Sequence, residues 1–176
     1  HCDVLVAGGG AAGIMAALQA GRAGARVILA DEQNEFGGWL LGEVDVTIDG
    51  AAPADWVAGA VAELQAMPDV TLLPRTTVFG YMDHNYLTLT ERVTDHMADA
   101  PAHLPRQRLW KVRAAHTVLA QGAHERPLVF SGNDLPGVML AGAVRTYINR
   151  YGVVPGNRTV VSVSYTHLTL PTSSWV

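Results

Sequence analysis

The sequence predicts an α/β fold with a parallel sheet, and three features near its start support that prediction. An apolar run over residues 3–7 is typical of a buried strand, and a glycine-rich turn follows it at residues 8–13. Residues 14–23 are rich in alanine, which suits a helix that packs closely on a sheet. A second apolar run at residues 26–30 has the pattern of the next parallel strand. Strand, turn, helix and strand in this order predict a Rossmann-like βαβ unit.

The turn carries the spacing G-x-G-x-x-G at Gly8, Gly10 and Gly13. Gly8 allows a tight turn, Gly10 lets backbone amides approach a pyrophosphate, and Gly13 lets the helix lie close to the strand. Gly24 is placed to end the helix. The start of the helix offers unpaired N–H groups and the positive end of the helix dipole to a phosphate. We therefore predict that a dinucleotide binds at this turn.

An acidic pair follows the second predicted strand. Asp31 comes 18 positions after Gly13, near the roughly 20 expected for the acid that hydrogen-bonds a ribose diol. The carboxylates of Asp31 and Glu32 would also repel the 2′-phosphate of NADP. The sequence therefore favours NAD or FAD as the bound nucleotide.

The patterns after this acidic pair extend the sheet. Gly37 and Gly38 form a second glycine turn, which is either a loop passing close to the dinucleotide or a simple turn. A helix is expected to begin at Pro53 and to end before Pro68, and Gly80 is expected to mark a bulge in a strand. The other patterns predict a further buried strand at 70–73, a meander over the βαβ sheet with strands at 76–81, 86–90 and 108–112, a buried strand at 117–120, a helix at 140–151 and the start of a strand at 159–161.

The strand expected at residues 117–120 leads to Gly122, a second place where the backbone can approach a cofactor. The cluster of His124, Glu125 and Arg126 comes just after it, and a functional and a structural role are equally open. No other group of residues predicts catalysis, so the catalytic residues stay unassigned. Seven histidines without an i, i+4 pair and a single cysteine predict no metal site and no disulfide.

The domain organisation follows from these elements. Residues 1–127 are expected to form a first FAD- or NAD-type dinucleotide-binding domain, incomplete in this chain. Residues 128–162 are expected to form a connection and the start of a second nucleotide-binding domain. The chain is expected to be truncated before the main part of that domain. Because a strand that belongs at the centre of a sheet follows His1 almost at once, we expect a fragment of a longer protein. Residues 163–176 resemble a translated sequencing adapter and are expected to be a non-native tail.

The composition limits the classes of function. A formal net charge of −4 with scattered charged residues gives no basis for nucleic-acid binding or for a membrane-binding face. No apolar run reaches the length of a transmembrane helix, and the first residues form a strand pattern rather than a signal peptide. We expect a cytoplasmic protein without a nucleic-acid or membrane partner.

Four runs of residues carry a resemblance to a known family: V-I-L-A-D-E-Q at 27–33, F-G-G at 36–38, G-A-H-E-R-P at 122–127 and P-G-V-M-L-A-G-A-V-R-T-Y at 136–147. With these runs, the chain resembles the pyridine-nucleotide-disulfide-oxidoreductase superfamily and, within it, the alpha subunits of heterotetrameric sarcosine oxidases. The related subunits of hydrogen cyanide synthases and opine oxidases share the general pattern and stay open as alternatives.

The resemblance implies an oxidoreductase that converts sarcosine to glycine with oxygen and tetrahydrofolate in an intact hetero-oligomeric complex. It implies NAD, or FAD, in the first dinucleotide site of this chain, FMN and FAD elsewhere in the complex, and an amine substrate on a partner subunit. The alternative is a non-catalytic nucleotide-binding module that supports another subunit, and the fragment alone is expected to be inactive. By position, the resemblance implies cofactor contacts from Ala12 at the pyrophosphate, from Asp31, Glu32 and Gln33 at the ribose, from Trp39 after the second turn, and from Val78 at the adenine. Gly38, in the second turn itself, is a further candidate for cofactor contact.

Overall fold

The computed structural model describes residues 1–161, so the tail predicted at residues 163–176 lies outside the described residues. The chain divides into two compact units, His1–His124 and Glu125–Val176, and each is described by itself. The domain boundary expected after residue 127 stays a prediction. Within the described residues, no helix combines the length and the apolar character needed to cross a bilayer.

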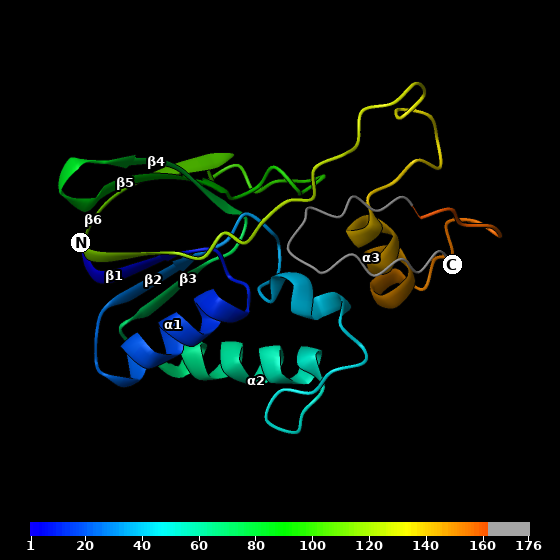
Figure 1. Ribbon diagram of the computed structural model, residues 1–176. Helices are drawn as coiled ribbons and strands as arrows, with labels where there is room; N and C mark the ends of the chain where they lie inside the picture. Colours follow the sequence, from blue (N-terminus) through cyan, green and yellow to red (C-terminus); the bar gives the residue numbers. More distant parts are fainter. Residues whose placement is uncertain (162–176) are drawn as a thin grey trace. The chain divides into compact units, whose positions relative to one another are not determined.

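The first unit is an α/β structure built on one mixed sheet of six strands (Figure 1). Strands β3, β2, β1 and β6 pair in parallel, and strands β6, β5 and β4 pair antiparallel. This arrangement confirms the predicted fold class, a parallel sheet joined to a meander. The strands lie in the order β3-β2-β1-β6-β5-β4, and their bounds are β1 (Cys2–Ala7), β2 (Val27–Ala30), β3 (Val70–Leu73), β4 (Thr76–Met82), β5 (Tyr86–Arg92) and β6 (Gln107–Leu119).

The last strand differs from the prediction. The sequence predicts two strands at 108–112 and 117–120, but the structure has one continuous strand, β6. Its first half pairs antiparallel with β5, and from Ala114 onward it pairs in parallel with β1. The residues between the two apolar patterns, 113–116, are extended because they pair first with β5 and then with β1. Local periodicity does not reveal such pairing. The bulge predicted at Gly80 is confirmed, because the register between β4 and β5 shifts between Val78 and Gly80.

Helices α1 (Ala11–Arg22) and α2 (Pro53–Ala66) cover one face of the parallel strands, and the meander covers the other face (Figure 1). Both faces are apolar, because successive residues of a strand point to opposite sides of a sheet. Leu5 packs in the cluster beneath the meander, and Val6 packs in the cluster beneath the helices. Both side chains are fully buried. The parallel strands are thus the central layer of three, which holds their carboxyl ends together at one edge.

The helices of the first unit confirm the prediction, with small differences at their ends. Helix α1 begins within the glycine-rich stretch, directly after Gly10, three residues earlier than the alanine-rich pattern predicts. Gly24 lies just past its end with a φ of +79°, a value that favours glycine. Two short 3-10 helices, η1 (Gly38–Gly42) and η2 (Asp83–Asn85), complete the unit.

In the second unit, the structure describes residues 125–161. This segment contains α3 (Ala141–Tyr151), which confirms the predicted helix, and Gly152 follows it in the left-handed conformation. Residues 159–161 are irregular, so the start of a strand expected there is wrong. A strand requires a neighbouring strand that exchanges backbone hydrogen bonds with it, and no strand of the described residues pairs with this segment.

Candidate dinucleotide-binding site

The glycine turn follows β1 at the carboxyl edge of the parallel strands, and the fold itself requires two of its three predicted glycines. Gly8 has a φ of +106°, and a Cβ atom placed on it would lie 2.2 Å from the carbonyl oxygen of Ala120. A Cβ atom on Gly13 would lie 1.8 Å from the carbonyl oxygen of Gly8. The backbone segments therefore approach so closely that any side chain here would displace one of them.

The third predicted glycine, Gly10, is not required by the packing of the protein. It precedes α1 with a φ of −76°, which every residue can adopt, and a Cβ atom placed on it would meet nothing within 4 Å. Serine or asparagine would be at least as favourable as glycine at this N-cap position. The fold therefore does not require glycine here, and the space at Gly10 is open.

The start of α1 has features that suit an anion. No side chain caps the helix, and its first turn contains no acidic residue. Ile14 N–H donates to the Gly10 carbonyl oxygen at 2.9 Å, so the helix ladder does not use the N–H groups of residues 11–13. Ala12 is exposed in this first turn. Helix α2 begins differently, with Pro53 at its first position and an aspartate in its first turn. The start of α1 is therefore the better place for a pyrophosphate.

The predicted ribose acid, Asp31, follows β2 and is held against the same turn. Its Oδ2 atom accepts a hydrogen bond from Gly9 N–H at 2.5 Å, and its Oδ1 atom accepts one from Gln33 N–H at 2.7 Å. Each carboxylate oxygen can accept a further donor, such as a ribose hydroxyl. The sequence assigned no role to Gly9, although it lies between two of the predicted glycines and its N–H orients the Asp31 carboxylate.

The second glycine turn packs against the first. Gly37 N–H donates to the Gly9 carbonyl oxygen at 2.7 Å, and a Cβ atom on Gly38 would lie 3.2 Å from the Cα atom of Gly10. This packing places the second turn beside the glycine-rich turn, and whether it also passes close to a dinucleotide stays a prediction. Trp39 follows in η1, and 46% of it is exposed.

The other predicted contact residues lie in three places. Glu32 and Gln33 are exposed in the loop after β2. Gly122 is exposed three residues after the end of β6, a strand that runs parallel to β1. Val78 lies on β4, where it is half-buried and packs against the cluster between the parallel strands and the meander. The contacts of these residues with a nucleotide stay predictions.

The remaining candidate groups have structural surroundings. In the second unit, Glu125 Oε2 accepts a hydrogen bond from Gly142 N–H at 2.8 Å. For Glu125, one member of the cluster at residues 124–126, the structure therefore shows a structural role.

The single cysteine, Cys2, is buried. Burial raises the pKa of its thiol, so the thiol is a poor nucleophile. Among the residues that the structure describes, no three histidine, cysteine or acidic side chains gather as metal ligands.

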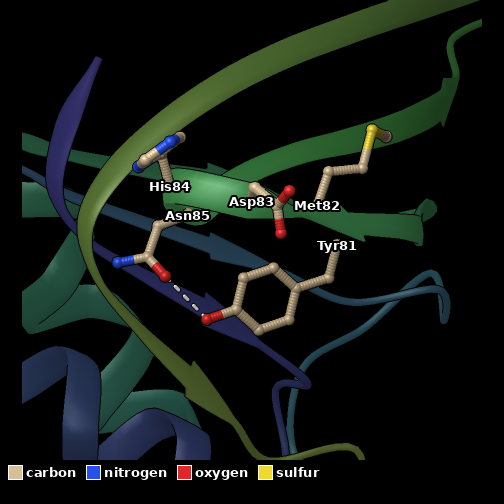
Figure 2. A pocket seen from close by; sticks show the side chains of 5 residues that line it. All are labelled: Tyr81, Met82, Asp83, His84 and Asn85. Atoms are coloured by element: carbon tan, nitrogen blue, oxygen red, sulfur yellow. Dashed lines mark hydrogen bonds between the residues drawn. The ribbon is translucent and has the colours of Figure 1, made fainter.

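A shallow hollow lies at the hairpin between β4 and β5, lined by residues 81–85 (Figure 2). It lies at the amino end of the parallel strands, because the neighbouring part of β6 begins its pairing with β1 at Cys2. The Tyr81 hydroxyl donates to Asn85 Oδ1 at 2.7 Å, and Asn85 Nδ2 donates to the carbonyl oxygen of Ala115 at 2.9 Å. These hydrogen bonds tie the hairpin to β6, which is a structural role.

The glycine turn, the uncapped start of α1 and the acid after β2 define a dinucleotide-binding domain of the Rossmann-like class. The chain belongs to the FAD dependent oxidoreductase family, whose family model matches residues 3–128. The membership confirms that the predicted class of protein, a nucleotide-binding oxidoreductase, is correct.

Individual relatives narrow this class. The alpha subunit of sarcosine oxidase from Rhizobium meliloti (strain 1021) is 56% identical over 156 residues, which cover 89% of this chain and 16% of that protein. An opine oxidase subunit from Agrobacterium tumefaciens (strain Ach5) is 30% identical over 163 residues, covering 90% of this chain and 31% of that protein. Among solved structures, L-proline dehydrogenase from P. horikoshii matches with a TM-score of 0.70 and 25% identity, covering 88% of this chain and 29% of that one. The predicted resemblance to the alpha subunits of sarcosine oxidases is confirmed, and this chain spans about a sixth of the length of the Rhizobium protein.

Proposed function

We propose that this chain is the dinucleotide-binding part of a sarcosine-oxidase-like amine oxidoreductase. The observation that carries the proposal is the open space at Gly10 beside the uncapped start of α1. The packing of the chain accounts for Gly8 and Gly13 but leaves the space at Gly10 free, beside the uncapped start of α1, for a bound group. The similarity to the alpha subunit of sarcosine oxidase, at 56% identity, supports the choice of an amine oxidase.

The residues at the turn suit the two polar parts of a dinucleotide. The N–H groups of residues 11–13 would bind the pyrophosphate, and the Asp31 carboxylate would accept hydrogen bonds from the adenosine ribose. The negative charges of Asp31 and Glu32 disfavour a 2′-phosphate, so NAD or FAD suits the site better than NADP. A bound flavin supplies two-electron oxidation, while the residues of the chain bind and orient the nucleotide. The further proposed contacts are Gln33, Gly38, Trp39, Val78 and Gly122.

We propose that the whole protein is a hetero-oligomeric oxidase in the cytoplasm. The sarcosine oxidase and opine oxidase relatives are named as subunits, which supports partner subunits for this chain. By resemblance, the complex would oxidise sarcosine to glycine with oxygen and tetrahydrofolate, and FMN and FAD would bind elsewhere in it. A partner subunit would hold the amine substrate, so this chain alone is expected to show no turnover.

A second candidate function is a non-catalytic module in which the nucleotide stabilises the fold and supports a partner. One observation is compatible with it: no residue of the chain is assigned to the chemical step, and the single cysteine, Cys2, is buried at the start of β1. Turnover of the intact complex, measured with and without the nucleotide, separates the two functions. A structural nucleotide would leave the turnover of each folded complex unchanged.

The proposed function is tested by calorimetry of the full chain with FAD, NAD and NADP. We expect FAD or NAD to bind more tightly than NADP. Asp31→Ala should weaken the binding by about 1 to 3 kcal/mol, because it removes charge-assisted hydrogen bonds to the ribose. Asp55→Ala, which removes an exposed aspartate at the start of α2, serves as the matched control and should leave the Kd unchanged. Failure of the chain to bind any adenine dinucleotide would contradict the proposal.

A further inference from the structure

The loop after β2, which carries the proposed ribose acid, is held through three consecutive carbonyl oxygens. The backbone N–H of Thr76 donates to the carbonyl oxygen of Asp31, and that of Arg75 donates to the carbonyl oxygen of Gln33, each at 2.7 Å. The carbonyl oxygen of Glu32 lies between them and accepts a hydrogen bond from the guanidinium of Arg92 at 2.5 Å. The backbone therefore supplies the two outer donors, and a single side chain supplies the middle one.

Arg92 is placed at this loop by the pairing of the meander. It is the last residue of β5, and its N–H donates to the carbonyl oxygen of Arg75 at 3.0 Å. Arg75 in turn has a φ of +54°, which directs the chain from β3 into β4. A side chain sixty residues away in the sequence thus reaches the peptide that follows the acid.

That peptide also holds the acid itself. The carbonyl of Glu32 and the N–H of Gln33 belong to one planar peptide unit, so fixing one of these groups fixes the other. The Gln33 N–H donates to Asp31 Oδ1 at 2.7 Å, while Gly9 N–H holds Oδ2 against the glycine turn. The hydrogen bond from Arg92 therefore sets the direction of one of the two donors that orient the carboxylate.

We infer that Arg92 is a positioning residue for the adenosine ribose: through the Glu32–Gln33 peptide it holds the Asp31 carboxylate in the orientation that accepts the ribose hydroxyls. This inference rests on the proposed dinucleotide site. The loop itself keeps its two backbone hydrogen bonds when Arg92 is replaced, so the effect is expected on ribose binding rather than on folding.

A double-mutant cycle on nucleotide binding tests the inference, with the full chain and with ADP as the probe. Arg92→Met should raise the Kd for ADP about tenfold, the size of one lost hydrogen bond. In an Asp31→Ala background the same change should have no further effect, because the carboxylate that Arg92 positions is absent. The Kd for 2′,3′-dideoxy-ADP should be insensitive to Arg92→Met, because that probe lacks the ribose hydroxyls.

The matched control is Arg26→Met. Arg26 lies at the other end of β2, is exposed and bonds Asp3, so its loss removes the same charge from a place far from the acid. Equal losses of ADP and dideoxy-ADP binding in Arg92→Met, or additive losses in the cycle, would overturn the inference while leaving the proposed function intact. The inference would also be overturned if Arg92→Met lowered the free energy of unfolding enough to account for the whole loss of ADP binding. Wild-type chain that binds neither ADP nor a dinucleotide would instead refute the proposed function.

Discussion

The two ends of the parallel strands use an aspartate in different ways. At the amino end, Asp3 Oδ1 pairs with the Arg26 guanidinium at 2.7 Å, and Asp3 Oδ2 accepts the Arg26 backbone N–H at 2.8 Å. At the carboxyl end, the two hydrogen bonds to the Asp31 carboxylate come from backbone N–H groups. A cation of the protein neutralises the first carboxylate, whereas neutral donors orient the second. The difference teaches that the fold can orient a carboxylate with backbone groups alone, which suits the ribose proposed to bind Asp31.

The two ends also differ in how the protein closes them. At the amino end, Asn85 ties the β4–β5 hairpin to the carbonyl oxygen of Ala115. At the carboxyl end, Gly10 faces open space beside an uncapped helix. Substitutions at the amino end should therefore change the stability of the protein but not nucleotide binding. At the carboxyl end, some substitutions should change stability and others should change nucleotide binding alone.

The largest effect is expected where the fold requires a glycine at the carboxyl end. Gly13→Ala should lower the free energy of unfolding by about 3 kcal/mol or more, because the added Cβ atom would lie 1.8 Å from the Gly8 carbonyl oxygen. Denaturant unfolding measures this change. Gly59→Ala is the matched control, because nothing lies within 4 Å of a Cβ atom at that position of α2, and it should stabilise the protein by about 0.5 to 1 kcal/mol. Equal stability of the two variants would contradict the close approach at Gly13.

The next effect separates binding from folding. Gly10→Ser should leave the free energy of unfolding within about 0.5 kcal/mol of the wild type, because serine is a favourable N-cap residue. The same change should raise the Kd for FAD or NAD at least tenfold, about 1.4 kcal/mol, because the side chain occupies the space proposed for the pyrophosphate. Calorimetry measures the Kd. An unchanged Kd would show that the open space at Gly10 is not a ligand site.

A smaller effect on stability is expected at the amino end. Asn85→Ala should lower the free energy of unfolding by about 1 kcal/mol, because it removes the hydrogen bonds to Tyr81 and Ala115. Asn85→Gly also removes these bonds but tolerates the φ of +50° at this position, so comparing the two variants isolates the backbone contribution. Nucleotide binding should be unchanged in both. A loss of binding would show that the two ends of the sheet are coupled.

The smallest effect concerns the pH dependence of the ion pair at the amino end. Hydrogen bonds from the Arg26 side chain and backbone lower the pKa of Asp3 from 3.8 to about 2. A carboxylate with a lowered pKa stabilises the folded state above pH 3.8, and this contribution is lost as the pH falls toward about 2. The effect should be small, because the pair is exposed. NMR titration should show the pKa of Asp3 rising toward 3.8 in Arg26→Met, and an unchanged pKa would refute the assigned cause.

Local patterns were sufficient for most elements of the first unit. The spacing of Gly8, Gly10 and Gly13 predicts the turn, because the positive φ that Gly8 adopts is a property of a few neighbouring residues. Strand β6 is longer than the two strands that its local patterns predict. Residues 113–116 are extended because β5 and then β1 pair with the strand. The strand expected at 159–161 fails for the opposite reason, because no described strand pairs with it.

By itself, the sequence determined the βαβ unit, the glycine turn and the acid after the second strand, because each depends on neighbouring residues and their periodicity. Only the tertiary structure decided that packing requires Gly8 and Gly13 but not Gly10, since that distinction depends on where other backbone segments pass. The tertiary structure also brought Arg92 to the peptide that orients Asp31. No local pattern encodes a contact across sixty residues, because the pairing of the strands creates it.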